Sequence, residues 1–174
     1  MNDRKNTLSA ISLFSGAGGM DLGFARAGFD VHWSNDLDGT ACETYQTNFN
    51  SENVIGPIEN LAKSLKRFSD VDCVFGGPPC QGFSVAGKMD LDDPRSKLVY
   101  QFMDIISALR PKSFVMENVP SLATLNKFTK FREQLVQHAH SLGYATDLQI
   151  FSSSEFGVPQ DRRRMFFVGV LGNR

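Results

Sequence analysis

The sequence has no long hydrophobic run and no closely spaced pair of cysteines. No uninterrupted apolar stretch approaches the roughly 20 residues that span a membrane, and the first residues lead into no apolar signal segment. The three cysteines, Cys42, Cys73 and Cys80, lack Cys-x-x-Cys spacing, which argues against a disulfide framework or a zinc site. We therefore expect a cytoplasmic protein with no membrane segment and no metal.

An excess of basic residues is also missing. Lys and Arg number 18 against 19 Asp and Glu, which leaves a formal net charge of −1 at pH 7. A domain that binds DNA unaided usually carries clustered positive charge, because phosphate contacts supply most of the affinity. The composition therefore gives no sign of a self-sufficient DNA-binding surface.

The chain does contain a regular alternation of strand-like and helix-like segments. Apolar, β-branched runs predict strands over residues 10–14, 29–34, 54–55, 71–75, 113–116, 146–151 and 165–170. Helical spacing predicts helices over residues 19–27, 39–49, 61–68, 98–109 and 128–142. The length of 174 residues fits one domain, residues 1–174, of the α/β class with a doubly wound, mostly parallel sheet.

One loop places a thiol directly after a predicted strand. The run Gly76-Gly77-Pro78-Pro79-Cys80-Gln81 follows the strand at 71–75. Its prolines fix φ and remove N–H donors, and its glycines allow close backbone approach. Stiff loops at the carboxyl ends of strands carry the reactive groups of open α/β sheets. A buried structural cysteine is the common alternative, but the preceding Gly-Gly-Pro-Pro segment favours a reactive thiol at Cys80.

A glycine-rich turn follows the first predicted strand, in the run Phe14-Ser15-Gly16-Ala17-Gly18-Gly19. Such a turn lets a ligand lie against bare backbone at a helix N-terminus, although many doubly wound folds contain one. Asp36 stands at the end of the second strand, where a carboxylate can accept hydrogen bonds from the ribose of a nucleoside cofactor. A loop or helix-capping role explains Asp36 equally well by itself.

Polar groups also flank two later strands. Glu117 leaves the apolar strand 113–116, where partial desolvation is expected to raise its pKa and suit it to proton donation. Gln160, Arg162 and Arg164 alternate before the last strand, which puts them on one face of an extended segment. An ion-paired Glu and a solvated basic turn are the ordinary alternatives. The apolar residues that follow favour arginines pointing inward, toward an anionic or carbonyl target.

Together these segments resemble the cytosine-C5 DNA methyltransferases. Four family motifs occur in the family's order: residues 14–19, residues 77–84 (Gly-Pro-Pro-Cys-Gln-Gly-Phe-Ser), Glu117-Asn118-Val119, and Gly157-Val158-Pro159-Gln160 with Arg162 and Arg164. Arg95 and Leu98 match a further helix-start motif. The resemblance covers nearly the whole chain. It implies the Rossmann-like fold of class I S-adenosylmethionine-dependent methyltransferases, with the last strand antiparallel and the fold incomplete at the C-terminus.

The resemblance implies a role for each catalytic residue. Cytosine C5 is a poor nucleophile, and Cys80 matches the thiolate that adds to C6; a free thiol has a pKa of about 8.5, so some activation is expected. Glu117 matches the acid at N3. Arg164, supported by Arg162, matches the group that holds O2 and braces the acid. The base cannot be reached within a duplex and must be flipped out.

S-adenosylmethionine is the implied methyl donor. Residue-by-residue matching assigns to its pocket Phe14, Gly16, Ala17, Gly19, Asp36, Leu37, Ile58, Pro79 and Leu98, and to nucleic-acid contacts Gln81, Ser84 and Gln160. The family usually has an Asp before Ile58 that reaches the adenine amino group, and this chain has Pro57. A proline offers neither a carboxylate nor an N–H, so we expect that contact to be weaker or met elsewhere.

The family continues beyond the last predicted strand with a target-recognition region, a helix behind it and a late Gly-Asn motif, and this chain stops at Arg174 without them. We therefore expect a heterodimer of a restriction-modification system, in which a second chain carries the target-recognition domain and makes most DNA contacts. Three alternatives stay open: a non-catalytic cofactor-binding regulatory subunit, a cytosine-C5 methyltransferase of RNA such as tRNA, and a truncated product.

Overall fold

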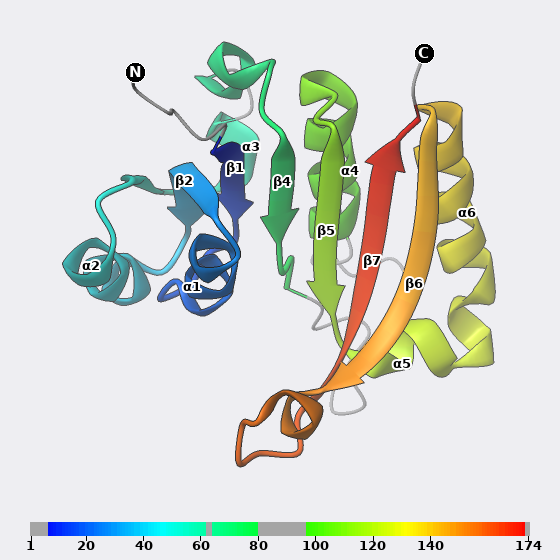
Figure 1. The fold of residues 1–174 in the computed structure, drawn as a ribbon. Coiled ribbons are helices and arrows are strands. Elements are labelled where there is room, and N and C mark those ends of the chain that lie inside the picture. Colours follow the sequence, from blue (N-terminus) through cyan, green and yellow to red (C-terminus); the bar gives the residue numbers. More distant parts are fainter. Residues whose placement is uncertain (1–6, 62–63, 80–96, 173–174) are drawn as a thin grey trace, which may run out of the picture.

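The computed structural model describes residues 7–61, 64–79 and 97–172, and its strands form one sheet of seven in the order β3-β2-β1-β4-β5-β7-β6 (Figure 1). The strands are β1 (Leu8–Leu13), β2 (Phe29–Asp36), β3 (Glu52–Ile55), β4 (Cys73–Gly76), β5 (Ser113–Asn118), β6 (Tyr144–Ser152) and β7 (Arg163–Leu171). Pairings from β3 to β5 are parallel, and β7 runs antiparallel to both β5 and β6. The expected doubly wound α/β fold with an antiparallel last strand is confirmed.

The helices connect the strands in the expected alternation. They are α1 (Gly19–Arg26), α2 (Gly39–Asn48), α3 (Ile58–Leu61), α4 (Lys97–Leu109), α5 (Pro120–Thr124) and α6 (Thr129–Ser141), with 3₁₀ segments at Ser64–Phe68, Asn126–Phe128 and Ser153–Phe156. Within the described ranges, no helix is long and apolar enough to cross a membrane.

The helix predicted over residues 61–68 is wrong. The chain instead makes the short α3, which starts at Ile58, and then a separate 3₁₀ segment. The first turn begins early because the carbonyl of Pro57 accepts a hydrogen bond from Asn60 N–H (3.1 Å). Strands β2 and β5 each run two residues further than predicted, so Asp36 and Glu117 belong to the strands themselves.

The main hydrophobic core lies on the sheet face covered by α4 and α6, which stand behind the strands in Figure 1. From β5 and β7, every second side chain enters this core: Phe114 and Met116, and Met165 and Phe167. The buried residues of α4 are Val99, Phe102, Met103, Ile105, Ile106 and Leu109. Those of α6 are Phe131, Leu135 and Ala139. The helices bury residues at helical spacing and the strands bury every second residue. The remaining residues of each strand therefore point away from this core.

The opposite sheet face is only half covered. In Figure 1, α1 and α2 lie in front of the β1–β2 side of the sheet, and the ring of Phe24 in α1 stacks on Phe75 of β4 (3.8 Å between centroids). None of the described helices lies in front of β5, β7 and β6. There the alternate residues Val115, Phe151, Phe166, Val168 and Val170 form what we call the open sheet face. Phe151 and Val170 in it are 40% and 54% exposed.

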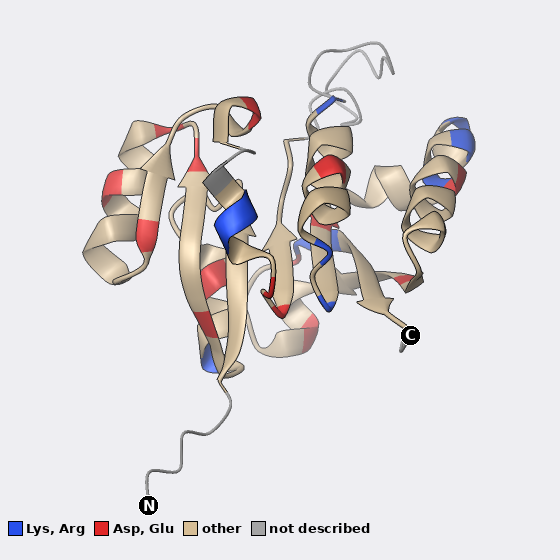
Figure 2. Ribbon diagram, turned by 90° about the horizontal axis from the view of Figure 1, so that it is seen from above, with Lys and Arg blue, Asp and Glu red and all other residues tan. Residues whose placement is uncertain are grey.

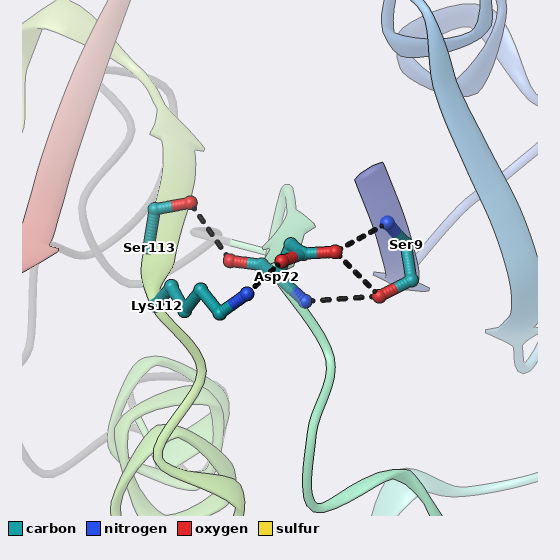
Figure 3. A network of polar contacts seen from close by, with 4 residues as sticks. All are labelled: Ser9, Asp72, Lys112 and Ser113. Atoms are coloured by element: carbon teal, nitrogen blue, oxygen red, sulfur yellow. Dashed lines mark hydrogen bonds and ion pairs between the residues drawn. The ribbon is translucent and has the colours of Figure 1, made fainter. Parts of the chain in front are cut away.

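A carboxylate joins three strands at the amino-terminal end of the sheet (Figure 3). Asp72 precedes β4 and accepts hydrogen bonds from the backbone N–H and the hydroxyl of Ser9 (2.7 and 2.9 Å). Lys112 donates a hydrogen bond to the other carboxylate oxygen of Asp72 (2.6 Å). The backbone carbonyl of Asp72 accepts one from the hydroxyl of Ser113 (3.0 Å). The Lys112 hydrogen bond, with those of Ser9, lowers the pKa of Asp72 below its usual 3.8.

Replacing Asp72 with Ala should lower the free energy of unfolding at neutral pH by about 1–3 kcal/mol, because the N–H and hydroxyl of Ser9 lose their acceptor. Lys112→Ala should cost less than about 1 kcal/mol, since that side chain is 76% exposed. The pKa of Asp72 is lower in the folded than in the unfolded protein, so ionised Asp72 stabilises the fold fully at pH values above its unfolded-state pKa. The difference between wild type and Asp72→Ala should therefore shrink as the pH falls below about 4. Urea unfolding at several pH values measures this, and a difference that grows in acid would contradict it.

Candidate active site

A cavity of about 720 Å³ opens at the edge of the sheet where the parallel strands end. Its walls come from the ends of β1, β4 and β5, from the segment 151–166 and from α1. Because β7 is antiparallel to β5, the start of β7 meets the end of β5 at this edge. Of the predicted site residues, the cavity brings together Phe14, Glu117, Arg162 and Arg164.

Glu117 and Arg164 form an ion pair inside this cavity. Arg164 Nε lies 2.8 Å from Glu117 Oε1, and the two side chains are only 25–26% exposed. Burial is the largest influence on Glu117 and raises its pKa, while the charges of Arg164 and then Arg162 oppose that rise. The carboxyl is thus held closer to neutrality than an exposed Glu, and a guanidinium fixes its direction. This environment suits a group that donates a hydrogen bond or proton to a ring nitrogen.

The turn before β7 only partly matches the predicted alternation. Strand geometry begins at Arg163, so Arg162 and Gln160 belong to the preceding turn. Arg162 still lines the cavity, and its N–H donates to the carbonyl of Gln160 (3.2 Å). The side chain of Gln160 is exposed and does not line the cavity, so its predicted role in nucleic-acid binding stays a prediction.

The loop that leads to Cys80 leaves β4 beside Glu117. A Cβ on Gly76 would overlap the carbonyl oxygen of Leu13, and one on Gly77 would lie 3.1 Å from Glu117 Oε2. Gly76 therefore needs glycine for the close approach of backbone, and a side chain at position 77 would require the Glu117 carboxyl to shift by a few tenths of an ångström. Asn118 Nδ2 donates to the carbonyl of Pro78 (3.2 Å) and ties this loop to β5. Pro79 is exposed; Cys80, Gln81, Ser84 and Arg95 lie outside the described residues.

The other two cysteines are structural. Cys42 and Cys73 are buried free thiols, and burial raises the pKa of both, to about 11 for Cys73. A thiolate is the nucleophilic form of cysteine, so neither is poised to react. Outside the undescribed segments, no group of three or more His, Cys, Asp or Glu residues could hold a metal.

The glycine-rich loop is held by the end of β2. Phe14 has a positive φ of 56°, an uncommon conformation for a side-chain-bearing residue, and it lines the cavity. Ser15 N–H donates to the carbonyl of Asn35 (2.9 Å). Gly16 N–H donates to Asp36 Oδ2 (2.7 Å), which turns the predicted ribose-binding carboxylate toward the loop. Each carboxylate oxygen can accept a second hydrogen bond, so this contact leaves room for ligand hydroxyls.

The remaining predicted cofactor residues do not line the cavity. Leu37 follows Asp36 and is 71% exposed, which gives a flat ring an apolar surface to lie on. Leu98 packs at the border of the core, whereas Ile58 is 3% exposed and belongs to the core. Pro57, which stands where the family usually has an Asp, is exposed. Bare glycine backbone, a carboxylate and an exposed apolar side chain fit a nucleoside cofactor.

Sequence reasoning missed an aromatic wall of the cavity. Phe151, Phe156 and Phe166 line it from β6, from the 3₁₀ segment and from β7. Phe151 packs against both others, with ring centroids 5.6 and 5.8 Å apart. The unbroken apolar runs Ile150-Phe151 and Met165-Phe166-Phe167-Val168, which put apolar side chains on both faces of these strands, were the available signal. It could not say which face would remain without a helix.

Comparison with known proteins agrees with this geometry. A sequence model of the family described as C-5 cytosine-specific DNA methylase matches residues 8–174. The chain belongs to this family. Its relatives include the Type II methyltransferase M1.HphI of Haemophilus parahaemolyticus, 41% identical, with 94% of this chain and 46% of that protein aligned. The Type II methyltransferase M.AquIA of a Picosynechococcus strain is shorter: it is 38% identical, and 91% of this chain aligns with 70% of it.

A solved structure supports the same family assignment. It belongs to a protein assigned as a DNA modification methyltransferase, encoded within a prophage (E. coli). The TM-score is 0.82 at 37% identity, and the match covers 94% of this chain and 47% of that one. The family and this fold imply S-adenosylmethionine as the methyl donor. The chain spans about half the length of M1.HphI and of this structural neighbour.

The carboxyl of Glu117 should titrate above its usual 4.5, and it should titrate higher still in Arg164→Met, because a charge that lowers its pKa is removed. Arg162→Met should shift it upward by less, since the Arg162 charge is the smaller influence. The measurement is a ¹³C NMR titration of the Glu117 carboxyl in the three proteins. An unchanged Glu117 titration in Arg164→Met would mean that the ion pair does not exist in solution.

Proposed function

We propose that this chain is the catalytic part of an enzyme that transfers a methyl group from S-adenosylmethionine to C5 of cytosine in DNA. The observation that carries the proposal is the partly buried Glu117–Arg164 pair, which lies next to Gly77 at the start of the Cys80 loop. An acid aimed at a ring nitrogen and a guanidinium suited to a carbonyl oxygen match the N3 and O2 edge of cytosine. The Type II methyltransferase names of the relatives favour DNA as the substrate.

In this proposal Cys80 acts as the nucleophile. Its sulfur forms a bond to C6 of the flipped base while the C5=C6 electrons move to form C4=C5 and those of C4=N3 move onto N3, which Glu117 protonates. Arg164 holds O2 and keeps Glu117 oriented. S-adenosylmethionine, when bound by the glycine-rich loop and Asp36, supplies an electrophilic methyl group on a positively charged sulfur. The C4=C5 electrons would form the new bond from C5 to the methyl group, which restores C4=N3, and N3 returns its proton to Glu117. A water molecule then takes the C5 proton; the C5–H electrons form C5=C6 as the C6–S bond breaks and the thiolate leaves.

We further propose that a second polypeptide completes the enzyme. About half the length of M1.HphI has no counterpart in this chain. Phe151 and Val170 of the open sheet face are apolar and half exposed, and Asp147 and Gln149 of β6 lie beside them on the same face. Basic and acidic residues are interspersed over the helices and strands, as Figure 2 shows, which agrees with the net charge of −1. DNA-facing positive charge and a cover for the open sheet face are therefore assigned to the second polypeptide.

The covalent step is tested by trapping. DNA that carries 5-fluorocytosine at the target blocks the final elimination, because fluorine at C5 cannot leave as a proton does. With cofactor and the completing polypeptide present, wild type should form a denaturation-resistant protein–DNA adduct, and Cys80→Ala should form none. Cys42→Ala is the matched control and should still trap, because that thiol is buried. An adduct that persists in Cys80→Ala would overturn the assignment.

A tRNA substrate run in parallel tests the RNA alternative: methyl transfer to tRNA but not to DNA would replace the proposed substrate.

The second polypeptide is tested by co-expression with the product of an adjacent reading frame that carries the missing motifs. Methyl transfer to duplex DNA should require both chains, and Val170→Asp should weaken their co-purification by at least about tenfold, since it places a charge in an apolar contact. Leu8→Asp, at a comparably exposed position in β1, should not. If the isolated chain methylates duplex DNA as fast as full-length relatives, the proposed heterodimer is wrong.

A further inference from the structure

A buried carboxylate stands behind the glycine-rich loop and has no place in the catalytic scheme. Asp21 lies in the first turn of α1 and is fully buried, with 0% of its surface exposed. Ser12 of β1 donates a hydrogen bond to Asp21 Oδ2 (3.0 Å), and Tyr45 of α2 donates one to Oδ1 (2.9 Å). Burial raises the pKa of Asp21. A charged residue in the interior costs stability unless its partners compensate for the lost water, so this position needs a reason.

The bond from Ser12 to Asp21 spans the base of the loop. Ser12 precedes the loop of residues 14–19 and Asp21 follows it, so their hydrogen bond joins the two ends of the loop. Ser12 also lines the large cavity. The position of the loop backbone relative to the cavity therefore depends directly on the Asp21 carboxylate.

The bond from Tyr45 fixes the loop from its other side. The ring of Phe49 stacks on Tyr45 with 4.6 Å between centroids, and a Cβ on Gly18 would overlap the ring of Phe49. Gly18, at the end of the loop, thus lies directly on this aromatic pair. Tyr45 is itself anchored by Ser51 (2.8 Å between the two hydroxyl oxygens). The Asp21 carboxylate thereby holds both elements that contact the loop, β1 through Ser12 and α2 through Tyr45.

We propose that Asp21 is a positioning residue for cofactor binding, which acts through Ser12 and Tyr45 on the glycine-rich loop. The loop touches the cofactor and Asp21 does not. Phe14 holds a positive φ of 56°, a conformation that a residue with a side chain keeps only when its surroundings hold it there. The inference rests on the assignment of that loop to S-adenosylmethionine in the proposed function.

Cofactor affinity of the chain, measured by isothermal titration calorimetry with S-adenosylmethionine and S-adenosylhomocysteine, tests the inference. Asp21→Ala should raise the dissociation constant of both ligands by at least about tenfold, because both hydroxyl contacts are lost. Asp21→Asn keeps the shape and one acceptor oxygen, and its amide can donate to the other hydroxyl. It should therefore restore affinity to within about threefold of wild type. Tyr45→Phe, which removes one contact, should fall between the two.

The matched control is Asp72→Asn, which removes a bridging carboxylate at the opposite end of the same sheet. It should lower the melting temperature and leave both dissociation constants unchanged when affinity is measured well below that temperature. Unchanged affinity in folded Asp21→Ala, or equal losses in Asp21→Ala and Asp21→Asn, would overturn the positioning role. If Asp21→Ala does not fold, Asp21→Asn and Tyr45→Phe decide, and wild-type affinity in Tyr45→Phe counts against the proposal. If wild type binds neither ligand, the cofactor assignment itself falls, an outcome distinct from the failure of Asp21 alone.

Discussion

The ion pair between Glu117 and Arg164 depends on the reversed direction of one strand. In a wholly parallel sheet, the residues at the start of a strand lie at the edge opposite to the reactive groups. Strand β7 is antiparallel to β5, so Phe166 faces Glu117 and the residues just before it reach the carboxyl edge of the sheet. The arginines, the acid and the loop that begins at Gly77 meet for this reason. Without the reversal, the same residues would be separated by the length of a strand.

The two ends of the sheet use carboxylates for different purposes. At the amino-terminal end, Asp72 keeps its charge with nearby donors and joins β1, β4 and β5. At the carboxyl end, Glu117 lies partly exposed in a cavity, and its partial burial raises its pKa. Asp21 lies between these cases, because it is buried as deeply as a core residue but contacts the elements that frame the loop. Burial with partners stabilises a fold, and burial at a cavity prepares a group for chemistry.

The described helices cover the two faces of the sheet unequally. One face carries a continuous core under α4 and α6, which is sufficient to order all seven strands. The other face leaves apolar side chains of β5, β6 and β7 beside the cavity. The chemistry and its cofactor loop are built from strand ends that this core holds in place. Contacts with a duplex need charge and area, which the described surface of the chain does not concentrate.

The sequence by itself predicted most of the local structure and the family of the chain. Runs of apolar residues at periods of two and 3.6 predicted all seven strands and most helices, and the motifs around Cys80, Glu117 and Arg164 were sufficient to assign the family. It misjudged residues 61–68, because competition between short turns depends on distant contacts. It also passed over Asp21, which in sequence is an ordinary acid in the first turn of a helix. Only the tertiary structure decided that β7 lies between β5 and β6, that Arg164 meets Glu117, and that Asp21 meets Tyr45. These pairings join residues far apart along the chain, and local patterns carry no information about which strand will lie beside which.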